Sequence, residues 1–179
     1  SCAGRSVHRW GMSISQTVSR TRRKLAAHIG AKNANELIFT PNATHSINQV
    51  ASGLEWNRGD IVITSDREHN SNLVPWLQQS NKGVELRTVK SLDDNTFDME
   101  AFDAACADAG RNLRMVSLVH VGNLDGVEIP VTEAAKIVHD HDAIVHVDGA
   151  QSAPHMPIDV EALNCDLFSF SLHKMLGPT

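Results

Sequence analysis

The chain alternates short runs of apolar residues with segments whose apolar residues recur at helical spacing. Continuous apolar runs are typical of strands buried on both faces, and their alternation with helices is typical of layered α/β proteins. The sequence predicts strands at Glu36–Thr40, Ile61–Ser65, Glu85–Val89, Leu113–Val121, Ala143–Asp148 and Leu167–Ser171. It predicts helices at 12–29, 47–54, 75–81, 99–109 and 130–141. We therefore expect one α/β domain of three layers with a mostly parallel central sheet.

The composition argues against several classes of function. The net charge is −5, which argues against a nucleic-acid partner or an anionic membrane surface, since both require a basic patch. No apolar run approaches the roughly 20 residues that span a bilayer. The cysteines, Cys2, Cys106 and Cys165, form no paired motif of the kind that binds zinc or builds a disulfide framework. We expect a reduced, cytoplasmic protein whose cysteines mostly fill the core.

Polar residues follow the predicted strands, where ligands collect in parallel sheets. Ala43 and Thr44 come after the first strand at a helix start, which suits a phosphate, although an ordinary capped turn has the same pattern. His69 follows the second strand, in a polar loop. It could stack on a planar ligand or move a proton, or it could be a surface histidine. Asn123 could bind a ligand oxygen or finish a turn.

The last two strands are followed by an acid and an amine. Asp148 ends a buried strand, where a carboxylate needs a partner such as a protonated ring nitrogen or a structural network of hydrogen bonds. Lys174 follows the final strand, next to His173, and an amine beside a buried cleft can attack a carbonyl. A lysine, an acid partner and a phosphate cradle are the parts that a pyridoxal-phosphate enzyme requires.

Several segments resemble fold-type I, class V aminotransferase-like proteins, and most nearly cysteine desulfurases and selenocysteine lyases. The resemblance runs in colinear order through essentially the whole chain. Its segments are Val7–Arg9, Thr44–Asn48, Glu68–Trp76, His120–Gly126, Val147–Gln151 and Phe170–Thr179. Each motif alone is modest, and together they are specific for the superfamily.

The resemblance implies a role for each site residue. Lys174 would hold pyridoxal 5'-phosphate as a Schiff base and later move the Cα proton, Asp148 would pair with the pyridinium nitrogen, and His69 would stack on the ring. His8 lies where the family approaches its substrate, and Asn123 would serve both substrate and cofactor. The remaining implied contacts are Asn123 and Gln151 with the phenolic oxygen, and the Ala43 N–H, Thr44, Ser171 and His173 with the phosphate.

The resemblance also implies what the parent protein does. It would take sulfur from cysteine or selenium from selenocysteine, leaving alanine and a persulfide in the cysteine case. It would pass the sulfur to an acceptor protein, as in iron–sulfur cluster assembly, and would form a homodimer. The family continues well past the lysine that Lys174 matches, into a part that carries the catalytic cysteine and the carboxylate-binding arginine. We therefore expect residues 1–179 to be a partial cofactor-binding large domain without the small C-terminal domain, and unable to desulfurate cysteine alone.

Three departures from the family pattern stand out. Ala43 replaces a frequent hydroxyl residue, Asn70 replaces a frequent second histidine, and Asp125 replaces an apolar residue. Alternative functions are a class V aminotransferase, another pyridoxal-phosphate lyase, or a non-catalytic module of the same fold. A metal site is a further alternative, built from His139, His141, His146 and Asp148.

Overall fold

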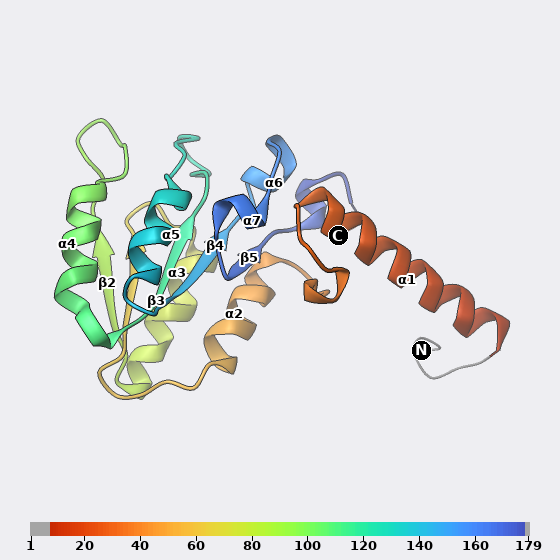
Figure 1. Ribbon diagram of the computed structural model, residues 1–179, viewed down its shortest axis with the longest axis horizontal. Helices are drawn as coiled ribbons and strands as arrows, with labels where there is room; N and C mark the ends of the chain where they lie inside the picture. Colours follow the sequence, from red (N-terminus) through yellow and green to blue (C-terminus); the bar gives the residue numbers. More distant parts are fainter. Residues whose placement is uncertain (1–7, 178–179) are drawn as a thin grey trace.

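The computed structural model describes residues 8–177 (Figure 1). The central sheet has five strands in the order β2-β1-β3-β4-β5, and every pairing is parallel. The strands are β1 Ile61–Ser65, β2 Glu85–Val89, β3 Leu113–Val119, β4 Ile144–Asp148 and β5 Leu167–Ser169. The predicted α/β fold with a parallel sheet is therefore confirmed, and all five carboxyl ends lie on the same edge.

Helices cover both faces of the sheet and complete the three layers. The α-helices are α1 Arg9–His28, α2 Ala43–Gly53, α3 Asn70–Leu77, α4 Met99–Ala109, α5 Val131–His139, α6 Ser152–His155 and α7 Val160–Leu163. Short 3-10 helices are η1 Ala34–Glu36, η2 Gln78–Lys82, η3 Gly110–Asn112 and η4 Leu172–Lys174. In Figure 1, α1 extends away from the rest of the molecule. Within residues 8–177, none of these helices combines the length and hydropathy that a membrane span requires.

The alternation of side chains along β1 separates two cores. Ile61 and Ile63 point into the larger one, which α4 and α5 cover with residues such as Phe102 and Val138. Val62 points to the opposite face, where α2 and α3 cover it with residues that include Trp76. The helices on the two faces fix the sheet from both sides, and this leaves its carboxyl edge open for a site.

The expected strand at Glu36–Thr40 does not form. Asn33 accepts a hydrogen bond from the backbone of Asn35, which turns the chain into η1, and no strand among the described residues pairs with the extended stretch that follows. Ile38 remains 71% exposed and Phe39 41% exposed, so neither fills a core. Apolar, β-forming residues were a misleading signal here because strand formation requires a neighbouring strand.

The helix expected from Pro75 begins earlier, at Asn70. The Nδ1 atom of His69 accepts from the Ser71 backbone N–H at 3.1 Å, which caps the helix, and Pro75 lies inside it. The helix then continues into the tighter 3-10 turn η2. The earlier start places His69 at the N-terminus of α3, beside the carboxyl end of β1.

Candidate cofactor-binding site

A cavity of about 310 Å³ opens at the carboxyl edge of the sheet. All nine residues that we expected to contact a cofactor line it: Ala43, Thr44, His69, Asn123, Asp148, Gln151, Ser171, His173 and Lys174. Asn42, Ser71, Val119 and Ala150 line it as well and were not among the residues predicted to contact a cofactor. The fold therefore gathers strand-end residues from along the chain around one volume.

The N-terminus of α2 forms one wall of the cavity. Asn42 caps this helix by accepting from the His45 backbone N–H at 2.9 Å. The Ala43 backbone N–H donates to Ser171 Oγ at 2.8 Å, and Thr44 Oγ1 lies 2.7 Å from Ser71 Oγ. Backbone N–H groups and hydroxyls gathered at a helix start form a site for an anion such as a phosphate.

His69 is held in one orientation at the start of α3. Its Nδ1 atom accepts from the Ser71 backbone N–H at 3.1 Å and lies 3.0 Å from Ser71 Oγ. Because Nδ1 accepts a hydrogen bond from a backbone N–H, the single hydrogen of a neutral His69 ring lies on Nε2. Ser71 thus links His69 to Thr44, the hydroxyl residue of the α2 wall. A serine two positions after a capping histidine was the available signal for this link.

Asp148 lies at the end of β4 with only 3% of its surface exposed. Its Oδ1 atom accepts from the Ala150 backbone N–H at 3.0 Å, and it has no ion pair within the part of the chain that the structure describes. Burial raises the pKa of Asp148, while that hydrogen bond and the charges of Lys174 and His69 oppose the rise. A buried carboxylate at a cavity wall is stabilised by a cationic partner, such as a protonated ring nitrogen.

Lys174 ends η4 and reaches the same cavity. Its side chain is exposed, and no hydrogen bond or ion pair within residues 8–177 holds its Nζ atom elsewhere. The backbone around it is fixed, since the Gly177 and Met175 N–H groups both donate to the Leu172 carbonyl. Lys174 therefore presents an unengaged amine from a fixed turn.

Glu68 is a candidate site residue that the sequence did not predict. It is partly buried just before His69, and its carboxylate accepts from Ser65 Oγ at 2.6 Å, Asn72 Nδ2 at 2.6 Å and the Val119 backbone N–H at 2.9 Å. Removal from water raises the pKa of Glu68 to about 7 despite these three donors, and Asp148 adds to the rise.

Two predicted site groups lie elsewhere. His8 caps α1 by accepting from the Gly11 backbone N–H, and it does not line the cavity. Among the described residues, no cluster of three His, Cys, Asp or Glu side chains could hold a metal. His139 instead contacts Asp166 at 3.0 Å, and His146 is enclosed between two serines. The structure therefore does not assemble the alternative metal site.

The fold agrees with comparison to known proteins. The family model for aminotransferase class-V matches residues 1–179, and the chain belongs to that family.

Individual relatives carry more specific names. A probable cysteine desulfurase of Halalkalibacterium halodurans is 39% identical over 179 residues, which are 98% of this chain and 43% of the relative. The apo structure of a cysteine desulfurase from Thermococcus onnurineus NA1 is 35% identical, with a TM-score of 0.91 over 99% of this chain and 44% of that one. A mutant of C-DES with glycine covalently linked to its PLP cofactor is 26% identical, with a TM-score of 0.84 over 96% of this chain and 46% of that one. This chain thus spans less than half the length of the relatives it matches.

Proposed function

We propose that this chain forms the pyridoxal-phosphate site of a cysteine desulfurase-like enzyme. The observation that carries the proposal is Asp148, a buried carboxyl group without an ion pair among the described residues, facing a cavity that Lys174 also enters. The volume of about 310 Å³ lies at the lower end of the range of small-molecule sites, roughly 300–1,000 Å³. The α2 N-terminus, which also lines the cavity, would take the phosphate.

Each residue of the cavity would then have a definite task. Bound pyridoxal phosphate supplies an aldehyde and an electron-withdrawing ring. Lys174 would bind the aldehyde carbon through Nζ and, once free again, would move a proton at the substrate Cα. Asp148 would keep a proton on the ring nitrogen, and His69 would lie against the ring face. Asn123 and Gln151 would orient the ring oxygen, while Ala43 N–H, Thr44, Ser171 and His173 would hold the phosphate.

The substrate is proposed to be cysteine or selenocysteine, from the names of the relatives and from the sequence resemblance. Neither described cysteine lines the cavity. Burial raises the pKa of Cys106 to about 12 and that of Cys165 to about 11, so neither thiol is activated as a nucleophile. A sulfur-accepting cysteine would come from a part of the protein other than residues 8–177. These residues are proposed to be part of a large cofactor-binding domain.

A homodimer is proposed from the surface of α1. Trp10, Ile14 and Val18 lie four residues apart, so they share one side of the helix, and they are 79%, 41% and 38% exposed. Figure 1 shows this helix projecting from the body of the molecule, with the end that His8 caps farthest from the sheet. A second copy would cover this side, and a substrate role for His8 would then be exercised in a partner's cavity. A sulfur-acceptor protein and a cytoplasmic location also remain predictions.

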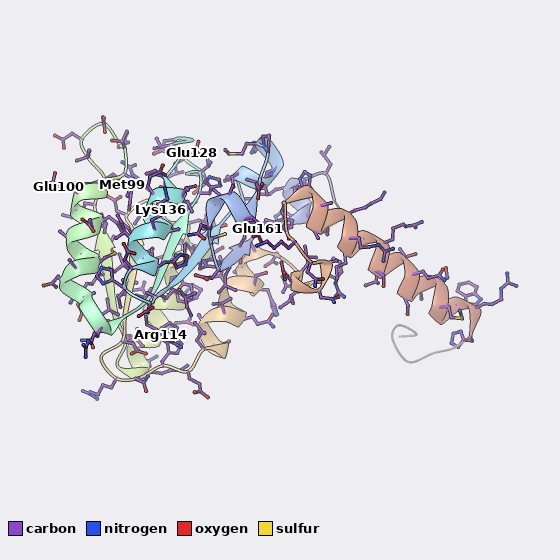
Figure 2. All side chains as sticks on the ribbon, viewed as in Figure 1. Met99, Glu100, Arg114, Glu128, Lys136 and Glu161 are labelled. Atoms are coloured by element: carbon purple, nitrogen blue, oxygen red, sulfur yellow. The ribbon has the colours of Figure 1, made fainter. Side chains whose placement is uncertain are left out.

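The decisive experiment is a pyridoxal-phosphate titration followed by absorbance. The wild-type protein should acquire a visible band as Lys174 binds the aldehyde, and Lys174→Ala should not. Lys136→Ala is the matched control, because Lys136 lies exposed on α5 (Figure 2) and does not line the cavity. If wild type and Lys174→Ala acquire the same band, the proposed role of Lys174 is wrong.

A further inference from the structure

A continuous chain of hydrogen bonds runs from the last strand of the sheet to Glu68. Ser169 Oγ lies 2.9 Å from His146 Nε2, and His146 Nδ1 lies 2.8 Å from Ser117 Oγ. Ser117 Oγ donates to Asn72 Oδ1 at 2.6 Å, and Asn72 Nδ2 donates to Glu68 Oε2 at 2.6 Å. The four residues before Glu68 are all buried, and they come from β5, β4, β3 and α3.

Trp76 fixes the donor-to-acceptor direction of this chain of hydrogen bonds. The Trp76 indole N–H, which can only donate, points to Asn72 Oδ1 at 3.2 Å. The Asn72 amide is therefore fixed with its oxygen toward Trp76 and its nitrogen toward Glu68. Rotating the amide by half a turn would place the NH₂ group against the indole N–H, and two donors would then face each other.

The proton positions along the rest of the chain follow from that orientation. Ser117 uses its single hydrogen on Asn72, so its oxygen accepts from His146 Nδ1–H. His146 remains neutral because burial lowers its pKa to about 3. Its Nε2 atom is then bare and accepts from the Ser169 hydroxyl. Every hydrogen in the chain points toward Glu68.

Glu68 is surrounded by donors alone. Besides Asn72, the Ser65 hydroxyl and the Val119 backbone N–H both donate to its Oε1 atom. A protonated Glu68 could donate only to Ser65 Oγ, whose present donation would have to reverse, because neither Val119 N–H nor the fixed Asn72 amide nitrogen can accept a hydrogen. The surrounding protein is thus arranged for a carboxylate, although no cation pairs with Glu68 among the described residues.

We propose that Glu68 is a positioning residue of the cofactor site, stabilised as a carboxylate by its three donors Ser65, Asn72 and Val119, and that its charge favours a cation beside Asp148. This inference rests on the proposed function, because the cation would be the protonated ring of the cofactor. The charged neighbours are Asp148 of β4, which acts on Glu68 directly, and His69 and Lys174, which act on Asp148. A second carboxylate that interacts with Asp148 would make this part of the cavity selective for a protonated ring.

The test measures pyridoxal-phosphate affinity by equilibrium dialysis of the full-length apo-protein at several pH values on both sides of 7, with thermal unfolding of each variant. In the wild type, affinity should rise as pH increases through about 7, where Glu68 becomes charged. Glu68→Gln should bind about tenfold more weakly above that pH and should lose the rise. Its amide also places a donor against either Asn72 or Val119, so it should unfold at a lower temperature.

Two further variants separate charge from hydrogen bonding. Ser117→Ala breaks the chain of hydrogen bonds at the residue before Asn72, and this should lower the stability. It leaves all three donors on Glu68, so the variant should keep the wild-type affinity and pH profile. Glu68→Gln with Asn72→Asp restores a donor for every acceptor while moving the charge to position 72, and its affinity should remain low.

The outcomes distinguish the two proposals. If the double variant regains wild-type affinity and pH dependence, or if Ser117→Ala loses both as Glu68→Gln does, Glu68 acts only through packing and the inference is overturned. Unchanged affinity and pH profile in Glu68→Gln would overturn it as well. If the wild-type protein binds no pyridoxal phosphate, the proposed function fails first.

Discussion

Ala43 and Ser171 are 128 positions apart in the chain, yet the Ala43 backbone N–H donates to Ser171 Oγ across 2.8 Å. This hydrogen bond joins the first residue of α2 to the segment after β5, and both residues line the cavity. The phosphate-binding wall that we propose is therefore assembled from two distant parts of the sequence. The Ser171 hydroxyl retains its own hydrogen for an anion, because its oxygen accepts from Ala43.

The first prediction concerns this hydroxyl. Ser171→Ala should weaken pyridoxal-phosphate binding by about 1–3 kcal/mol, because it removes a hydroxyl donor to the phosphate. Dialysis with pyridoxal, which lacks the phosphate, should show a much smaller loss. Ser52→Ala, at the other end of α2, is the control and should bind both ligands as the wild type does. Equal losses for both ligands would place Ser171 outside the phosphate site.

The sequence could predict the cavity residues because of a simple geometric rule. Parallel strands end at one edge, so polar residues at or just after their ends, such as His69, Asp148 and Lys174, must come close together. This rule could not single out Glu68 and Ser71 among the polar residues that follow β1. Their importance depends on partners such as Val119 N–H and Thr44 Oγ1, which only the folded chain brings within hydrogen-bonding distance. The failed strand at Glu36–Thr40 has the same cause, since residue preference alone cannot supply a neighbouring strand.

The second prediction concerns Gly149, directly after Asp148. A Cβ atom at this position would lie 2.0 Å from Cζ of Phe168, whose ring packs in the core and 5.9 Å from the ring of Phe170. Gly149→Ala should therefore lower the free energy of unfolding by about 1–3 kcal/mol. Adding Phe168→Leu, which removes the clashing ring atoms, should recover part of this loss in urea unfolding. If the double variant is no more stable than Gly149→Ala, the clash with Phe168 is not the cause.

The third prediction concerns Asp125, where this chain departs from the family pattern. Asp125 does not line the cavity, and its Oδ2 atom pairs with Arg67 at 3.2 Å. Arg67 also donates to Ser91 Oγ at 2.9 Å, so the pair ties together the loops that follow β1, β2 and β3. Both side chains are partly exposed, so Asp125→Leu should cost less than about 1 kcal/mol of stability, and high salt should reduce the difference.

Cofactor affinity provides the control measurement for Asp125→Leu. Because Asp125 is not part of the cavity wall, pyridoxal-phosphate affinity of Asp125→Leu should stay within about twofold of the wild type. Urea unfolding at low and high salt gives the stability difference. A large loss of affinity with intact stability would show that the Arg67–Asp125 pair positions His69 rather than only joining loops.

The fourth prediction concerns His146, whose buried ring stays unprotonated in the folded protein. Burial lowers its pKa from 6.5 to about 3, so below pH 6.5 the unfolded chain binds a proton that the folded protein does not. This group alone therefore makes stability fall with decreasing pH, by about 1.4 kcal/mol per pH unit, until the pH nears 3. Glu68 acts in the opposite direction between its unfolded pKa of 4.5 and about 7, since its folded pKa is raised.

Because the two groups oppose each other, wild-type stability alone cannot reveal either one. The measurement is the difference in unfolding free energy between wild type and His146→Gln at a series of pH values. Gln has no titrating ring, so the wild type should lose stability relative to the variant as pH falls below 6.5. His28→Gln, at an exposed position on α1, should leave the wild-type pH dependence in place. Parallel curves for wild type and His146→Gln would mean that His146 takes up its proton in the folded protein. The proton order assigned to the Ser169–Glu68 chain would then be wrong.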